Sequence, residues 1–525
     1  MWIVLFVAAL AGLPVEYVHW EITVRGPVAE AWVTQHVRND RYAYPVTGQF
    51  VMPLPYDGAV DAMRLVMGET VIDGDIKERR AAREAYDTAA REGTFAGLTA
   101  QEPGGEYTQD IANIPPRETV QVRVRVRWPV RRVQDGYELT LPTRVMPRYD
   151  MPQVESLSSG SPTIRVSLDA EAGFEVRGPH SPTHPDLPLH AAGSVLHLPD
   201  ASVQPGRDVV IRWSSAFDTL QAAALGPERH TVLVIEGPAA RPAVQTPVEW
   251  LIVLDTSGSM SGAPWLQARA IVREILDGMR EHDAAGLVTF GDDIRVLAAQ
   301  DGAMGAQAVW QMVQDSGPNG GTYLHHAVQQ SLDQKSGVDK RRILVLISDG
   351  LVDQDTETLR ALSQAQDEAD VAMIMVGDAP NAALIERMAT AAGGFVTRAL
   401  PNEHGEPGAR VLSAMQNASC SDLQVRWRGA VEQTSHVPRT LFAGRPVVVL
   451  AEHERPPLAA EVTCRVGSMR WSATALRREA LDDGAVRSLF GRARLEQVLH
   501  DGWRLAEDRQ AEGTAIALQY GLISP

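Results

Sequence analysis

Cysteine is scarce in this chain of 525 residues, which contains only Cys420 and Cys464. Two cysteines cannot build a disulfide framework or a four-thiolate zinc site, so thiol chemistry does not organise the fold. Both cysteines lie in a stretch of predicted strands. A single disulfide in an exported protein and two unpaired buried thiols therefore both remain open.

Basic residues are also in deficit, with 49 Lys and Arg against 66 Asp and Glu, which gives a formal net charge of -17. Binding to nucleic-acid phosphates requires clustered Lys and Arg, so this balance argues against a nucleic-acid partner. An acidic exterior repels polyanions and anionic lipid but leaves cation binding open.

Long apolar runs are missing except at the start, where Met1–Pro14 reads MWIVLFVAALAGLP. About a dozen residues are too few to span a bilayer but match a signal-peptide core, so no integral membrane span is expected. Ala9 and Ala11 provide a cleavage pattern, which predicts export to the periplasm, the cell surface or the medium. No Lys or Arg precedes the run, however. The alternatives are a start further upstream or a buried first strand in a cytoplasmic protein.

Alternating strands dominate residues 18–149. The segment VQVRVRVRWPV places Val on one face and Arg on the other, as expected for a strand buried on one side. One helix, from about Ile76 to Glu92, interrupts these strands. Short strand patterns separated by Gly, Pro and Ser continue through residues 155–215, and GPAARPAVQTP then resembles a linker.

Three separated motifs in this part resemble the vault/inter-alpha-trypsin (VIT) domain, a β-rich module that commonly precedes a von Willebrand A domain. The motifs are IKERRAAREAYDTAAREG, IANIPPRETVQVRVRVRWPV and YELTLPTRVMPRY. The resemblance covers roughly residues 18–150.

The pattern changes to strands alternating with helices from Val248 to about Met415. The helical patterns begin at Pro264, Tyr323 and Thr356. Near-continuous apolar strands between amphipathic helices predict a parallel sheet covered on both faces, as in a doubly wound α/β fold. The strand candidates are EWLIVL, AAGLVTF, RILVLIS and VAMIMVG.

Polar residues follow two of these strands, where the ends of parallel strands form a ligand-binding edge. Asp255, Ser257 and Ser259 follow the first strand in LIVLDTSGSM, and Asp349 follows RILVLIS. Thr322 lies between them in the Gly-rich segment SGPNGGTYL. These all-oxygen side chains suit a hard cation, Mg²⁺ most naturally and Mn²⁺ or Ca²⁺ alternatively. Because three of them are neutral hydroxyls, the ion would keep positions that an Asp or Glu of a protein partner could occupy.

The D-x-S-x-S pattern alone is weak, because it arises by chance and because Asp and Ser also cap helices. Together with the later Thr and Asp, it resembles the metal-ion-dependent adhesion site of von Willebrand A domains. That resemblance implies direct binding by Ser257, Ser259 and Thr322. It implies that Asp255 and Asp349 act partly through water.

The order of the parts resembles the inter-alpha-trypsin inhibitor heavy chains and bacterial proteins of similar layout. We therefore predict a multidomain protein in which a β-rich VIT domain and a β-rich flanking region surround a doubly wound, Rossmann-like von Willebrand A domain. The expected parts are a signal peptide or first strand (1–14), the VIT domain (15–150), a β-rich segment (151–220), a strand and linker (221–247), the A domain (248–416) and a β-rich segment with a C-terminal helix (417–525).

The function expected from these features is metal-dependent protein binding or adhesion rather than catalysis. The sequence contains no G-x-S-x-G, H-E-x-x-H or Walker A motif. An intracellular scaffold or assembly factor of the same fold is one alternative. A metal-dependent hydrolase, with His325 or His326 near the ion, is an alternative from another class.

Overall fold

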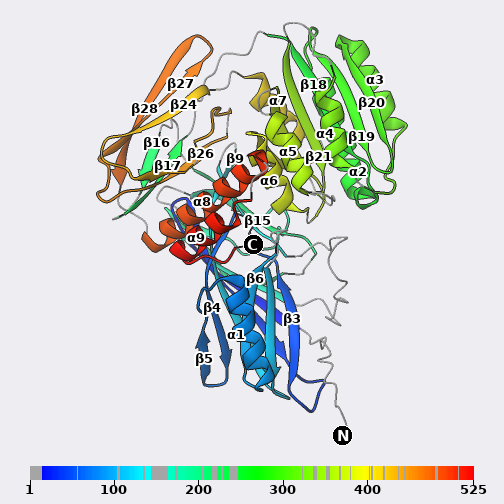
Figure 1. Cartoon of the computed structure of the whole chain (residues 1–525). Coiled ribbons are helices and arrows are strands. Elements are labelled where there is room, and N and C mark those ends of the chain that lie inside the picture. Colours follow the sequence, from blue (N-terminus) through cyan, green and yellow to red (C-terminus); the bar gives the residue numbers. More distant parts are fainter. Residues whose placement is uncertain are drawn as a thin grey trace.

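The computed structural model describes most of the chain from Val15 onward (Figure 1). The apolar run 1–14, most of the expected linker and Thr322 lie outside the described residues. The described residues are 15–524 without 56, 103–106, 134–135, 144–162, 172–175, 204–205, 216–221, 226–228, 236–245, 322, 335–339, 351–354, 366–367, 379, 401–402, 404–405, 418–419, 436, 443–444, 479–482 and 506–507.

The largest sheet has eight strands and occupies the lower part of Figure 1. In spatial order they are β13 (His190–Ala192), β14 (Val195–Val203), β11 (Thr163–Glu171), β1 (Val15–Arg25), β2 (Val28–Arg38), β8 (Thr119–Pro129), β4 (Ala59–Met67) and β5 (Thr70–Asp73). Strand β8 follows the alternation of its sequence, since Val120, Val122, Val124 and Val126 are all buried. Strands β1 and β11 pair in parallel, so segments on either side of residue 150 share one sheet.

Two smaller sheets and one helix complete the N-terminal part. The three-stranded sheet contains β3 (Val46–Met52), β7 (Tyr107–Ile114) and β6 (Ala96–Gln101). The four-stranded sheet contains β12 (Val176–His180), β15 (Val209–Ser215), β10 (Gly136–Leu141) and β9 (Arg131–Val133). Helix α1 (Arg79–Arg91) buries Tyr86, and its Arg83 forms an ion pair with Asp110 of β7. The helix is therefore fixed to the three-stranded sheet, while most of its other side chains face solvent.

The segment that alternates strands and helices forms a six-stranded sheet, which we call the α/β module. In spatial order its strands are β20 (Ile294–Asp301), β19 (Ala284–Phe290), β18 (Val248–Asp255), β21 (Arg341–Ser348), β22 (Asp370–Met375) and β23 (Phe395–Arg398). Strands β18, β19, β21, β22 and β23 pair in parallel, and only the edge strand β20 runs antiparallel to its neighbour.

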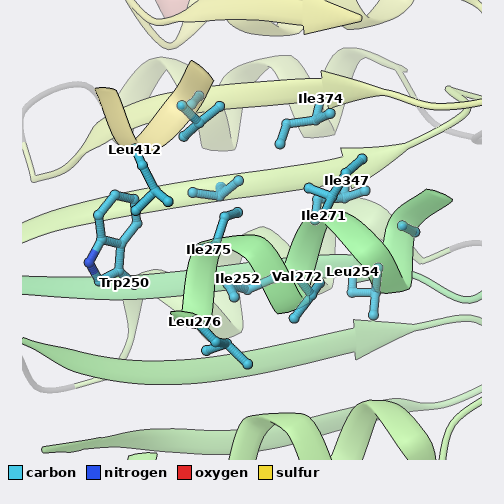
Figure 2. Packing of buried hydrophobic residues seen from close by; sticks show 14 of the residues in the cluster. Trp250, Ile252, Leu254, Ile271, Val272, Ile275, Leu276, Ile347, Ile374 and Leu412 are labelled. Carbon is cyan, nitrogen blue, oxygen red and sulfur yellow. The ribbon is translucent and has the colours of Figure 1, made fainter. Parts of the chain in front are cut away.

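Helices cover both faces of this sheet, as predicted for a doubly wound α/β fold. One face carries α2 (Ala263–Asp277), α3 (Gly302–Gln314) and α7 (Glu406–Gln416), and the other carries α4 (Leu324–Leu332), α5 (Asp355–Ala365) and α6 (Ala382–Ala391). Figure 2 shows Ile252 and Leu254 of β18 packed beneath Ile271 and Ile275 of α2. Val253, between them in sequence, points into the opposite core. The central strands are thus buried on both sides, which explains their continuous apolar sequence.

A seven-stranded sheet, the tail sheet, lies at the upper left of Figure 1. In spatial order it contains β24 (Cys420–Trp427), β27 (Ala459–Val466), β28 (Met469–Arg478), β16 (Ala222–Leu225), β17 (His230–Ile235), β26 (Val447–Glu452) and β25 (Gln433–Thr434). Cys420 and Cys464, on adjacent strands, form a disulfide with their Cα atoms 5.5 Å apart. Of the two alternatives for the cysteines, the structure therefore has the bridge.

Strands from both sides of the α/β module share the tail sheet, because β16 and β17 precede the module and the other strands follow it. Arg341 contacts both the entry to the module and its exit. Its backbone N–H donates to the Pro247 carbonyl at 2.9 Å, and its Nη1 donates to the Met415 carbonyl at 2.6 Å.

Helices α8 (Asp483–Leu505) and α9 (Gln510–Tyr520) return to the N-terminal part of the chain. Arg127 of β8 donates to the Ser488 hydroxyl at 3.0 Å, and the Ile523 backbone N–H donates to the Val60 carbonyl at 2.9 Å. Within the described ranges, no helix is both long and apolar enough to cross a bilayer.

Candidate metal centre

The predicted site lies at the carboxyl edge of two adjacent parallel strands. Asp255 is the last residue of β18, and Asp349 directly follows β21. The strands are in register, with Leu254 opposite Ile347. The fold therefore brings together two carboxylates that are separated by 94 positions in the sequence, one at the end of each strand.

Hydrogen bonds from two serines hold the buried carboxylate of Asp255. The backbone N–H of Ser257 donates to its Oδ1 at 2.8 Å, and the hydroxyl of Ser348 donates to its Oδ2 at 2.6 Å. The backbone N–H of Gly350 donates in turn to the Ser348 hydroxyl at 2.9 Å. Each of these donors lies in a strand end or the turn after it, so the orientation of the carboxylate is set by the fold.

Burial raises the pKa of Asp255 to about 7, and repulsion from the Asp349 carboxylate adds to this shift. The hydrogen bonds from Ser257 and Ser348 oppose the shift but do not cancel it. Both carboxylates are shielded from solvent, with 0% of Asp255 and 5% of Asp349 exposed. The edge of the sheet therefore carries negative charge that a cation would stabilise.

Two hydroxyls lie beside these carboxylates, on the turn between β18 and α2. The Oγ atoms of Ser257 and Ser259 are 3.0 Å apart. The 3₁₀ turn Gly258–Met260 brings them together, and Met260 anchors this turn in the core. Ser257 is buried and Ser259 is exposed, so the pair extends from the carboxylates towards solvent.

The loop before Thr322 packs against the turn that carries these serines. The Asn319 N–H donates to the Thr256 carbonyl at 2.6 Å, and the Gly258 N–H donates to the Gly320 carbonyl at 3.1 Å. The Gly321 N–H donates to Oδ1 of Asp292 at 2.7 Å. Thr322 itself is outside the described residues, but the residues just before it are fixed beside the candidate site.

Glycine is required at position 320 for two reasons. Its φ of 54° is in the left-handed region, and a Cβ atom there would overlap the carboxylate of Asp292. Sequence analysis selected the Gly pair but missed Asp292 and Ser348. The sequence offered little to identify them: Asp292 lies in the FGDD segment at the end of β19, and Ser348 directly precedes Asp349.

The donor set fits a hard divalent cation. Within the part of the chain that the structure describes, no group of three or more His, Cys, Asp or Glu side chains could hold a metal. The candidate site instead combines two carboxylates, Asp255 and Asp349, with the hydroxyls of Ser257 and Ser259. Oxygen donors without imidazole or thiolate favour Mg²⁺, Mn²⁺ or Ca²⁺ over softer metals.

Comparison with known families identifies two matching regions. Residues 15–126 match the family model of the vault protein inter-alpha-trypsin domain, and residues 251–402 match that of the von Willebrand factor type A domain. The second region includes every residue of the candidate site.

Individual relatives are distant. The mouse (Mus musculus) protein mono-ADP-ribosyltransferase PARP4 is 22% identical over 441 residues, which cover 79% of this chain and 22% of that protein. A von Willebrand factor A domain-containing protein of Dictyostelium discoideum is 21% identical, covering 80% of this chain and 46% of its own length. The chain therefore spans less than half of either relative.

Among solved structures, a von Willebrand factor type A protein from Catenulispora acidiphila overlaps 57% of this chain and 84% of its own chain. The TM-score is 0.38 and the sequence identity is 14%.

Proposed function

Because this chain carries a VIT domain followed by a von Willebrand factor type A domain, we propose that it is a metal-ion-dependent protein-binding module. The proposed ligands are Asp255, Ser257, Ser259, Thr322 and Asp349. A divalent cation held there, Mg²⁺ or alternatively Mn²⁺ or Ca²⁺, would supply a coordination position for an acidic side chain of a protein partner.

The observation that supports this proposal most strongly is the pair of carboxylates at the ends of β18 and β21. Burial and mutual repulsion raise the pKa of Asp255 to about 7. Structural carboxylates are normally stabilised by a positively charged side chain, whereas the hydrogen bonds to Asp255 come from two uncharged residues, Ser257 and Ser348. Such an arrangement favours the uptake of a cation.

The residues of the chain have distinct roles in the proposal. Ser348 and the Ser257 N–H orient the Asp255 carboxylate, and the loop held by Asp292 positions the segment that leads to Thr322. Ser259 is exposed, so its hydroxyl marks the side from which a partner approaches. The neutral hydroxyls leave positive charge uncompensated, which favours an acidic partner over a basic one.

A role in binding is preferred to catalysis. His325, one of the two histidines that the hydrolase alternative would place near the ion, has its Nε2 3.6 Å from the Glu357 carboxylate. Burial, followed by repulsion from His326, lowers its pKa, and Glu357 opposes this shift. A histidine paired with a carboxylate on the next helix is accounted for by packing between α4 and α5.

We also propose that the protein is exported. The disulfide between Cys420 and Cys464 supports this location, because such bonds persist in oxidising compartments and are rare in the cytosol. Cell fractionation followed by N-terminal sequencing of the isolated protein tests the proposal. Recovery of the protein from the cytosol with free thiols would contradict it and would favour the intracellular scaffold.

The central experiment is capture of partners from native extract by the full chain in Mg²⁺ or in EDTA. Asp255→Ala is the test variant, and Asp293→Ala, which removes an exposed carboxylate nearby, is the matched control. We expect a partner that is retained only with Mg²⁺, by the wild type and the control. Calorimetric titration of metal-free protein with Mg²⁺ and Mn²⁺ accompanies it. No heat of binding, or equal capture in EDTA, would overturn the proposal.

A further inference from the structure

A cavity of about 530 Å³ lies where three parts of the molecule meet. Strands β9, β10 and β15 of the N-terminal part form one wall, β23 and α6 of the α/β module form a second, and β26 of the tail sheet forms a third. Labels β9, β15 and α6 lie close together near the centre of Figure 1. The volume is in the range of pockets that hold small molecules.

The lining of this junction cavity combines apolar with charged side chains. Its apolar side chains include those of Val130, Trp213, Phe395 and Val448. Five arginines and three carboxylates also line it: Arg131, Arg212, Arg398, Arg410, Arg445, Asp57, Glu138 and Glu386. Such a concentration of arginine is unusual for a chain with a net charge of -17.

Four of the five arginines are balanced by carboxylates. The ion pairs are Arg131 with Glu386, Arg212 with Glu138 and Glu403, Arg398 with Asp208, and Arg410 with Glu403. Several of these pairs connect the N-terminal part to the α/β module. They account for the charge of four arginines and also hold the walls of the cavity together.

Arg445 is the exception. Its Nη1 donates to the Val396 carbonyl at 3.2 Å, and its guanidinium lies 4.7 Å from the centre of the Phe395 ring. Among the described residues, no carboxylate forms an ion pair with it. Burial, and then repulsion from Arg410, lower the pKa of Arg445 to about 10, and the more distant Glu138 and Glu386 carboxylates oppose this shift only in part. A guanidinium placed in this way can bind an anion, because its planar N–H groups can donate two parallel hydrogen bonds to the two oxygens of a carboxylate.

We propose that the junction cavity binds a small organic carboxylate, with its anionic end on Arg445 and its apolar body against apolar side chains of the lining such as Trp213 and Val448. A carboxylate is favoured over a phosphate because Arg445 is the one arginine of the lining without an ion pair among the described residues, so a single negative charge balances it. A doubly charged anion would leave excess negative charge beside the Asp57 carboxylate. The apolar walls favour a ligand with a hydrocarbon or aromatic body over a bare ion.

The occupied cavity would connect the α/β module to the other two parts, since each contributes a wall. A ligand that binds only when all three walls are in place stabilises their arrangement by mass action. This site is separate from the proposed metal centre and does not depend on it. Binding is therefore expected to be equal in EDTA and in Mg²⁺.

The test is calorimetric titration of the full chain, in EDTA, with 3-phenylpropionate as the probe. The neutral 3-phenylpropionamide and inorganic phosphate are the comparison ligands. We expect the carboxylate to bind at least about tenfold more tightly than either comparison ligand, because a hydrogen bond to a charged group contributes that much affinity. Equal binding of the amide, tighter binding of phosphate or no binding of the carboxylate would overturn the proposal.

Substitutions of Arg445 test whether 3-phenylpropionate binds in the junction cavity. Arg445→Gln is expected to weaken binding of 3-phenylpropionate by about tenfold or more. Arg470→Gln, which removes an exposed arginine of β28, is the matched control and should bind as the wild type does. Arg445→Lys keeps the charge and serves if the Gln variant fails to fold, with an intermediate loss expected. Unchanged affinity in a folded Arg445 variant would assign the carboxylate to another site and overturn the proposal.

Discussion

The Ser348 hydroxyl donates a hydrogen bond of 2.6 Å to Oδ2 of Asp255, which joins the ends of β21 and β18 through their side chains. The other carboxylate oxygen, Oδ1, accepts the backbone N–H of Ser257. Each oxygen thus has a partner within the protein and keeps further lone pairs for other contacts. The fold thus fixes Asp255 in one orientation, which in the proposed metal centre would lower the entropy lost when a cation binds.

Substitution of Ser348 tests this orientation. In Ser348→Ala the Asp255 carboxylate loses a charge-assisted hydrogen bond, and we expect the Mg²⁺ affinity to fall by about tenfold. Calorimetric titration measures the change. Ser363→Ala is the matched control, because Ser363 is a buried hydroxyl of α5 that donates to the Leu359 carbonyl. Equal Mg²⁺ affinity in both variants would show that Ser348 has no part in positioning the ligand.

The pH dependence of stability follows from the raised pKa of Asp255. That pKa is about 7 in the folded, metal-free protein, against 3.8 ordinarily. Between these values the folded state holds a proton that the unfolded chain has released. The free energy of unfolding should therefore fall as the pH rises, by at most roughly 1.4 kcal/mol per pH unit, and level off above about pH 7.

Saturating Mg²⁺ should oppose the fall in the free energy of unfolding with rising pH, because the cation and the proton compete for the Asp255 carboxylate. Urea denaturation across this pH range, in EDTA and in Mg²⁺, measures both effects. Asp255→Asn cannot ionise and should remove this contribution to the EDTA curve. If the wild type and Asp255→Asn have the same pH dependence in EDTA, the raised pKa is wrong.

Asp292 is predicted to position the loop that leads to Thr322. In Asp292→Ala the Gly321 N–H loses its acceptor, and we expect Mg²⁺ affinity to fall by about three- to tenfold while global stability changes by less than about 1 kcal/mol. Titration calorimetry and hydrogen exchange of the Gly321 amide measure these effects. Asp293→Ala removes the adjacent exposed carboxylate and should change neither quantity. A loss of affinity in both variants would indicate a general effect of surface charge.

Asp208 connects the N-terminal part of the chain to the α/β module. It accepts from Arg398 at 2.7 Å and from the Thr143 N–H at 3.1 Å, and both members of the ion pair are buried. Asp208→Ala leaves Arg398 buried without its carboxylate, so we expect destabilisation by roughly 3–5 kcal/mol. Urea denaturation measures it, with the exposed Asp186→Ala as control. A midpoint equal to that of the control would mean that water replaces the lost partner.

The sequence was sufficient to predict the α/β module and the placement of two carboxylates at its edge. Strands β18 and β21 are continuous apolar runs, and parallel strands end at a common edge, so Asp255 and Asp349 could be placed together without coordinates. The alternation of Val and Arg in β8 likewise predicted a strand buried on one face. These features are local, and periodicity reports local structure.

Contacts between distant segments could not be predicted in this way. No pattern in β1 indicates that β11, almost 150 residues later, would pair with it in parallel, because either strand could pair at any open edge. Asp292 was missed for the same reason, since its contact with the Gly321 N–H depends on the path of two loops. Helix α9 was also missed. Its buried residues, Gly513, Ile516, Ala517 and Tyr520, lie on one face, but two of them are the small residues Gly and Ala, and the apolar Leu518 is exposed. The sequence of α9 therefore lacks a clear amphipathic period.

The α/β module is a domain inserted between two strands of the tail sheet. The chain leaves the sheet after β17 and re-enters it at β24, and Arg341 contacts both crossing points, Pro247 and Met415. If the module is deleted and residues 247 and 416 are joined by a short linker, the rest of the protein should still fold, because an inserted domain whose ends lie close together can be removed without disturbing the surrounding fold. Truncation after residue 416 should instead remove β28, the partner of β16, and β26, the partner of β17. The exposed edges of β16 and β17 would then promote aggregation.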